Sequence, residues 1–84
     1  MNPQIEEVIE FMGELEQDSN VPRNIKTKLS SIIQRLKGAK EDDLSLTINQ
    51  LLSDLDEISG DSNLDQFTRQ QIWSISSMLE GINA

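Results

Sequence analysis

Sliding the 84-residue sequence along itself by 43 positions brings apolar residues onto apolar residues over most of its length. Ile5 falls on Ile48, and Met12 falls on Leu55. The segment 18–21 (Asp-Ser-Asn-Val) falls on 61–64 (Asp-Ser-Asn-Leu), so a polar turn recurs inside the alignment. Recurrence at a fixed offset is typical of a duplicated structural unit. We therefore expect a single helical-bundle domain, 1–84, made of two repeats, 1–41 and 42–84.

Each repeat carries two segments whose apolar residues recur at the spacing of an α-helix. The four predicted helices span roughly residues 3–17, 22–37, 43–59 and 65–81, and no segment alternates with the period of a strand. Short turns make consecutive helices antiparallel neighbours, and one helical hairpin cannot bury its own apolar face. The sequence predicts an all-α fold, an antiparallel four-helix up-and-down bundle from a duplicated helical hairpin.

Start signals and apolar stripes complete this prediction. Asn2 is expected to cap the first helix, Asp42 and Asp43 the third, and Asp65 the fourth. The expected core stripes contain Ile5, Val8, Ile9, Met12 and Leu15; Ile25, Leu29, Ile32, Ile33 and Leu36; Leu44, Ile48, Leu51, Leu52, Leu55 and Ile58; and Phe67, Ile72, Ile75, Met78, Leu79 and Ile82.

The composition excludes several classes of protein. There is no cysteine or histidine, so neither a disulfide nor the usual structural zinc site can stabilise the chain. No apolar run approaches the about 20 residues that cross a bilayer. The N-terminus also lacks the basic and apolar regions of a signal peptide. We expect a cytoplasmic protein that does not associate with membranes.

Catalytic and metal-binding chemistry lack their usual side chains. Without His, Cys and Tyr, acid–base and nucleophilic catalysis lose their commonest groups. Glu7, Glu10, Glu14 and Glu57 could bind magnesium only if they converged inside the bundle. At about 100° per residue, however, each points away from the apolar stripe of its own helix. We predict no catalytic residue, cofactor, metal or small-molecule site, and a carboxylate–magnesium enzyme is the weakest functional alternative.

Positive charge is confined to one segment. Six of the seven basic residues lie within 23–40, which contains no acidic residue, although the net charge of the chain is −8. The acidic total disfavours nucleic acid as a partner. The cations flank both sides of the second apolar stripe, as expected for a helix packed between acidic neighbours. The alternative is a nucleic-acid or ribonucleoprotein contact. The candidate basic patch consists of Arg23, Lys26, Lys28, Arg35 and Lys37.

Trp73 is expected on the side of its helix opposite the apolar stripe, together with Gln66 and Arg69. Tryptophan is enriched at the hot spots of protein interfaces, so these three residues form a candidate partner surface. The other interpretation is that the indole packs against a neighbouring helix or under the Arg69 guanidinium. The leading hypothesis for function is a non-enzymatic helical protein-interaction module that binds a protein partner or forms a homodimer.

Several short motifs resemble those of an archaeal family of short acidic proteins. They are the segments 21–24 (Val-Pro-Arg-Asn), 55–59 (Leu-Asp-Glu-Ile-Ser), 61–63 (Asp-Ser-Asn) and 77–80 (Ser-Met-Leu-Glu), and Arg69 followed by Ile72 and Trp73. The chain is similar over nearly its whole length to this family, which is known only as an uncharacterised protein family. One departure is Asp65, where proline is common after the second turn. The resemblance implies a compact four-helix bundle with bromodomain-like handedness and an archaeal, cytoplasmic source, and it implies no activity.

Overall fold

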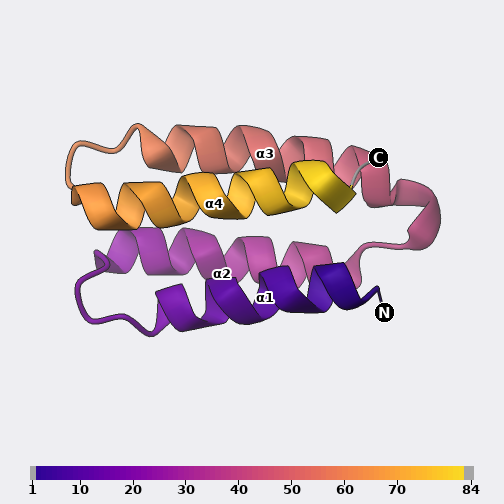
Figure 1. Cartoon of the computed structure of the whole chain (residues 1–84), viewed down its shortest axis with the longest axis horizontal. Helices are drawn as coiled ribbons and strands as arrows, with labels where there is room; N and C mark the ends of the chain where they lie inside the picture. The colour runs from indigo at the N-terminus through magenta and orange to yellow at the C-terminus, as the bar shows by residue number, and fades with distance from the viewer. Residues whose placement is uncertain (1, 83–84) are drawn as a thin grey trace.

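The computed structural model describes residues 2–82 and contains four α-helices (Figure 1). They are α1 (Pro3–Glu16), α2 (Arg23–Gly38), α3 (Leu44–Ser59) and α4 (Gln66–Ile82), with a short 3₁₀ turn η1 (Glu41–Asp43) before α3. Residues 2–82 contain no strand. The predicted all-α four-helix fold is confirmed, and each predicted helix end lies within one residue of the observed end.

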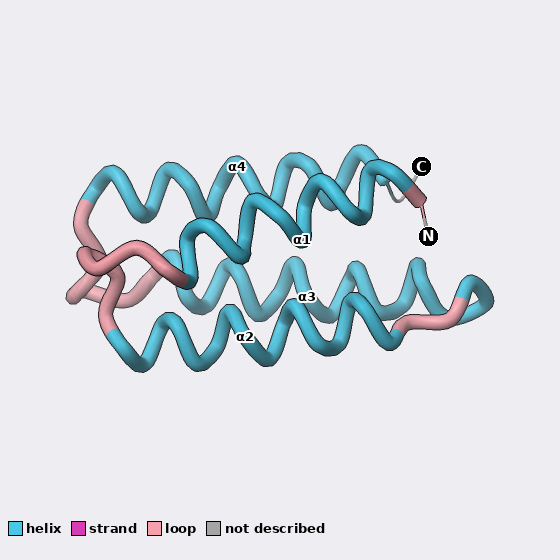
Figure 2. The backbone as a smooth tube through the Cα atoms, turned by 90° about the horizontal axis from the view of Figure 1, so that it is seen from below, coloured by secondary structure: helices cyan, strands magenta, loops and turns pink. Residues whose placement is uncertain are grey.

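The helices form a four-membered ring in which each one packs against two neighbours. Helix α1 contacts α2 and α4, and α3 contacts α4 and α2. Figure 1 shows consecutive helices running in opposite directions, so α1 begins and α4 ends at the same end of the bundle. Figure 2 shows α1 and α4 side by side in one layer and α2 and α3 in the other. This arrangement places the last helix beside the first.

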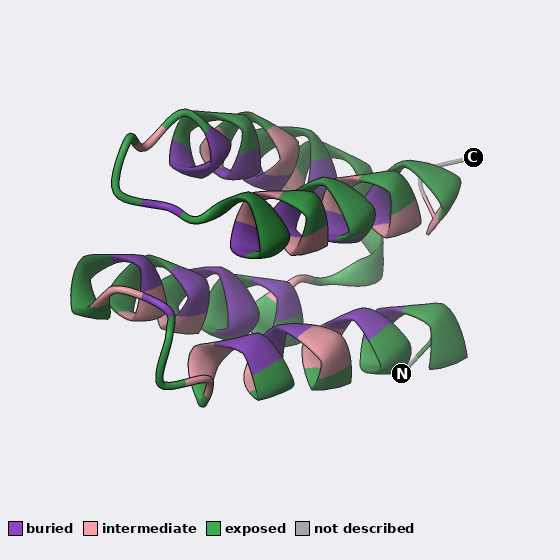
Figure 3. Ribbon diagram, turned by 60° about the vertical axis from the view of Figure 1, so that its left-hand side comes forward, coloured by how far each residue is buried: buried purple, intermediate pink, exposed green. Residues whose placement is uncertain are grey.

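One inward face of each helix supplies the core (Figure 3). Apart from Ile33 and Ser59, the buried residues of α1 and α3 are spaced by three, four and three positions, and those of α2 and α4 by four, three and four. The same 43-residue offset relates these positions. The related pairs are Ile5 and Ile48, Val8 and Leu51, Met12 and Leu55, Leu15 and Ile58, Ile25 and Thr68, Leu29 and Ile72, Ile32 and Ile75, and Leu36 and Leu79.

One residue predicted for the core, Phe67, lies outside it, whereas five others are partly buried and pack against its margin: Ile9, Leu44, Leu52, Met78 and Ile82. Phe67 was expected in the stripe of α4, but its side chain is 61% exposed. Thr68 takes the interior position instead and is 1% exposed. Successive helical residues differ by about 100°, so a buried Thr68 turns Phe67 outward. Leu52, expected near the centre of its stripe, is only half-buried, because Leu51 and Leu55 occupy the inward positions on either side.

Side chains form the predicted cap hydrogen bonds at two of the three helix starts. The side chain of Asn2 accepts a hydrogen bond from Gln4 N at 2.8 Å, and Asp65 Oδ1 accepts one from Thr68 N at 2.9 Å. Asp43 is the N-cap residue of α3, as predicted, but its side chain makes no capping hydrogen bond. Asp42 and Asp43 both belong to η1, in which Asp43 N donates to Lys40 O at 2.9 Å. A backbone turn thus replaces the expected carboxylate cap.

The two turns that join the hairpin helices have the same hydrogen bonds. Asn20 N donates to Asp18 Oδ1 at 2.9 Å, and Asn63 N donates to Asp61 Oδ1 at 2.8 Å. Each turn ends at a buried aliphatic residue, Val21 or Leu64. No helix within residues 2–82 is both long and apolar enough to cross a membrane.

Candidate functional site

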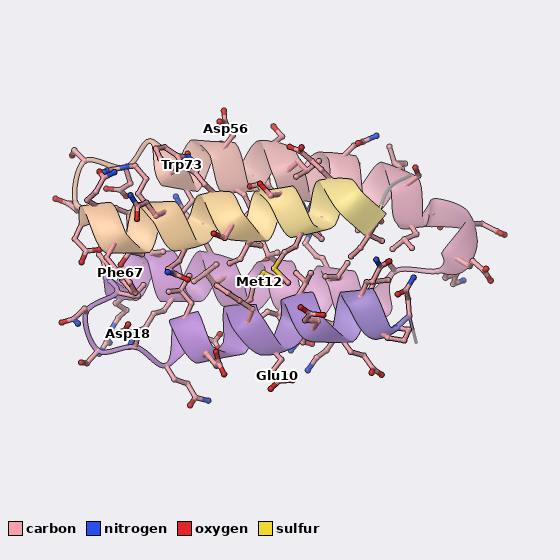
Figure 4. The ribbon with its side chains drawn as sticks, viewed as in Figure 1. Glu10, Met12, Asp18, Asp56, Phe67 and Trp73 are labelled. Atoms are coloured by element: carbon pink, nitrogen blue, oxygen red, sulfur yellow. The ribbon has the colours of Figure 1, made fainter. Side chains whose placement is uncertain are left out.

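Trp73 lies in the middle of α4, one turn after Arg69. Its side chain is 50% exposed, whereas the preceding residue, Ile72, is fully buried. The step of about 100° from Ile72 turns the indole toward an outer edge of the helix. Figure 4 shows Trp73 at the edge of α4 that borders α3. The bundle therefore covers about half of the indole and leaves the other half accessible to a partner.

Arg69 clamps the turn between α3 and α4. Its Nε donates to Ser59 O at 2.8 Å, and its Nη2 donates to Asp61 O at 3.0 Å and Leu64 O at 3.3 Å. Ser59 is the last residue of α3, where unpaired carbonyl groups attract a cation. The guanidinium is therefore committed to its own chain, a role that was not predicted from the sequence.

Gln66 is the third residue of the candidate partner surface that was predicted on α4. Its Oε1 accepts a hydrogen bond from Arg69 Nη1 at 3.3 Å, and its side chain is exposed. Gln66, Arg69 and Trp73 are separated by three and four residues, so they follow one side of the helix. The structure brings the three residues together, with Arg69 as the fixed member.

Asp65 is held in its charged form at the start of α4. Hydrogen bonds from the Thr68 side chain and then from the Thr68 backbone lower the pKa of the Asp65 carboxyl below its ordinary value of 3.8. The charge of Arg69 acts in the same direction. In the first repeat, Pro22 stands at the corresponding position and offers no side-chain cap. The charged Asp65 carboxylate thus stabilises the N-terminus of α4, and α2 has no corresponding acidic side chain.

The candidate basic patch is spread along α2. Arg35 Nη1 and Asp54 Oδ2 form an ion pair at 2.5 Å across the α2–α3 boundary. This is the only ion pair within residues 2–82, so the pairing with acidic neighbours expected from the sequence is present at Arg35 alone. Arg23, Lys28 and Lys37 are exposed, and Lys26 is half-buried. The three exposed cations are solvated.

The carboxylates of the described chain form no metal-binding cluster. Residues 2–82 contain no group of three or more acidic side chains arranged to hold a metal ion. Glu7, Glu10, Glu14 and Glu57 are all exposed. Figure 4 shows Glu10 on the side of α1 away from α4. Their arrangement is that of a solvated acidic surface.

Comparison with known proteins assigns the chain to a family. The family model described as "Uncharacterised protein family (UPF0147)" matches residues 1–82. The chain belongs to this family. A UPF0147 protein of Archaeoglobus fulgidus is 37% identical over 79 residues, which cover 94% of this chain and 88% of the relative. A UPF0147 protein of Methanothermobacter thermautotrophicus is 33% identical over 81 residues, covering 96% of this chain and 78% of the relative. No solved structure matches.

The comparison confirms the resemblance to an archaeal uncharacterised family. A third UPF0147 relative, from Methanosarcina acetivorans, is 37% identical over 78 residues, which cover 93% of this chain and 79% of the relative. In this UPF0147 chain the structure also reveals a feature that sequence reasoning missed. Phe11 and Phe67 line a shallow depression between α1 and α4. Only the neighbouring positions of the two helices bring these residues together, because they are 56 positions apart in the sequence.

Proposed function

We propose that this UPF0147 protein is a non-enzymatic helical interaction module that self-associates through the α4 surface around Trp73. The supporting observation is the half-exposed indole. Trp73 is the only tryptophan in the chain and one of three aromatic residues. Leaving half of a large ring in water forgoes much of the stabilisation that its burial would bring. In a domain with a thin core, this placement favours a contact surface.

The surroundings of Trp73 suit such a contact. Arg69 is fixed by its bonds to backbone carbonyl oxygens, so little side-chain entropy would be lost when a partner packs beside it. Gln66 is exposed and supplies polar groups at the margin. In a twofold dimer the same face of α4 would meet itself, and every contact would occur twice.

Self-association can be tested with Trp73 as its own reporter. Sedimentation and light scattering over a range of protein concentrations would compare the wild type with Trp73→Ser. The matched control is Leu46→Ser, because Leu46 on α3 is 60% exposed and its replacement removes a similar apolar group. We expect Trp73→Ser to shift the protein toward monomer, while Leu46→Ser behaves as the wild type. Circular dichroism should show the same helicity for all three.

The fluorescence of the single tryptophan provides the decisive second measurement. If the indole is buried on association, its emission should shift to the blue as the protein concentration rises. A wild type that stays monomeric at every concentration, with an emission maximum that does not move, would refute self-association through this surface.

The rival hypothesis is a nucleic-acid accessory protein acting through α2. The observation in its favour is that Arg23, Lys28 and Lys37 are exposed and form no ion pair within residues 2–82. Binding of single-stranded RNA that weakens steeply with salt and is lost in Lys28→Glu would support it. Lys40→Glu, the same charge change just outside α2, is the control.

A further inference from the structure

A second apolar surface lies on the opposite edge of α4 from Trp73. The depression between α1 and α4 has Phe11, Leu15 and Phe67 among its lining residues, and its volume is about 220 Å³. Phe67 is 61% exposed, and Phe11 is half-buried. Figure 4 shows Phe67 on the side of α4 that faces α1 and Trp73 on the side that faces α3. The two exposed aromatic residues therefore belong to separate surfaces.

The two repeats differ at this depression. In one half of the molecule, Asn24 Nδ2 donates to Asp61 Oδ2 at 3.3 Å and links α2 to the distant turn. Adding 43 to Asn24 gives Phe67, and subtracting 43 from Asp61 gives Asp18, so Phe67 and Asp18 are the corresponding pair. Both line the depression, but a phenyl ring has no hydrogen-bond donor. Within residues 2–82, the Asp18 carboxylate accepts only the bond from Asn20 N.

The charges around the depression are of one sign. Glu14 and Asp18 line it together with Gln71, and no cation does. Further along the same boundary, Glu7 lies beside Met78 in a smaller depression. An apolar floor with an acidic rim is complementary to a basic segment that carries an apolar side chain. Nucleic acid and anionic lipid are disfavoured here, because their phosphates would meet these carboxylates.

We propose that the α1–α4 surface binds a basic segment of another protein. One aromatic or aliphatic side chain of that segment would pack on Phe67 and Phe11. A lysine or arginine beside it would donate to Asp18 and Glu14. A second copy of this chain is a poorer occupant, because placing its basic helix α2 on α1–α4 would be a head-to-tail contact between two chains that each carry a net charge of −8.

The test uses a fluorescein-labelled peptide of about 14 residues, or about four helical turns, made of leucine and phenylalanine on one face and lysine on the other. Fluorescence anisotropy would measure its binding to the full chain. Phe67→Ser should weaken binding about tenfold or more, as expected for an anchor residue. Leu46→Ser, which removes an equally exposed apolar side chain elsewhere, should leave affinity within about twofold.

Charge is tested by a second matched pair. Glu14→Lys and Glu10→Lys change the net charge equally and on the same helix, but only Glu14 lines the depression. Glu14→Lys should weaken binding more than Glu10→Lys does, and the wild-type affinity should fall as salt rises to about 0.15 M.

Three results would overturn the proposal. The peptide could fail to bind, or a control peptide with serine in place of leucine and phenylalanine could bind equally well. Alternatively, Phe67→Ser could have no more effect than Leu46→Ser. The proposal is separate from self-association through Trp73: Trp73→Ser should leave peptide affinity unchanged, and Phe67→Ser should leave the oligomeric state unchanged. Failure of either proposal is therefore recognised independently of the other.

Discussion

Replacing Arg69 by methionine should destabilise the bundle far more than its exposure on α4 suggests. Methionine retains an unbranched apolar stem but removes the donors to the turn that joins α3 to α4. Two of the lost bonds are short, to Ser59 O at 2.8 Å and to Asp61 O at 3.0 Å, and the bond to Leu64 O is longer, at 3.3 Å. With about 1–2 kcal/mol for each short charge-assisted bond, the expected loss in free energy of unfolding is about 2–4 kcal/mol.

That loss is a large part of the stability of a domain of this size, about 4–12 kcal/mol. Urea denaturation at 25 °C, followed by circular dichroism, would measure it. The matched control is Lys26→Met, because Lys26 occupies the corresponding position of the first repeat (69 − 43 = 26). The Lys26 side chain, unlike that of Arg69, makes no hydrogen bond to its turn within residues 2–82, so its replacement should cost clearly less, about 0.5 kcal/mol.

The comparison between the two variants decides whether the clamp matters. Equal losses for Arg69→Met and Lys26→Met would mean that the carbonyl bonds of Arg69 contribute nothing beyond what water provides. Arg69 would then not stabilise the α3–α4 turn.

Three further predictions follow from burial, charge and the lack of a metal cluster. Ile32→Ala should lower the free energy of unfolding by about 2–5 kcal/mol, and the half-buried Leu52→Ala by clearly less, as measured by urea denaturation; equal losses would contradict the assigned core face. Because the pKa of Asp65 is lowered in the folded state, its stabilising effect is present above the unfolded value of 3.8 and is lost as the pH falls through the lower folded value. Asp65→Asn retains a capping group that does not titrate, so the melting temperatures of this variant and the wild type should converge in strong acid, and parallel curves would contradict the assignment. Millimolar magnesium, manganese or calcium should leave the melting temperature unchanged, since binding at 100 times the dissociation constant would stabilise by about 2.7 kcal/mol; a rise that saturates for one metal would restore the enzyme hypothesis.

Some features follow from the sequence by itself, because they depend on residues close together in the chain. The four helices follow from apolar spacings of three and four residues, and the caps at Asn2 and Asp65 bond only two or three positions ahead. The recurring turn could likewise be recognised from its letters, since Asp18 and Asp61 each bond to the asparagine two residues later. These contacts are nearly independent of how the helices pack.

Only the tertiary structure decided which side chains of different helices share a surface. The sequence placed Phe67 in the core, because its stripe could be drawn through Phe67 or through Thr68, and only packing against the other helices selects Thr68. The clamp by Arg69 needs the end of α3 beside the start of α4, and the depression under Phe67 needs α4 beside α1. Helical periodicity gives the direction of a side chain relative to its own axis but carries no information on which neighbour lies there. The Phe67 surface therefore emerges only when the four helices close into a ring, whereas the shared side of Gln66, Arg69 and Trp73 follows from the spacing within α4.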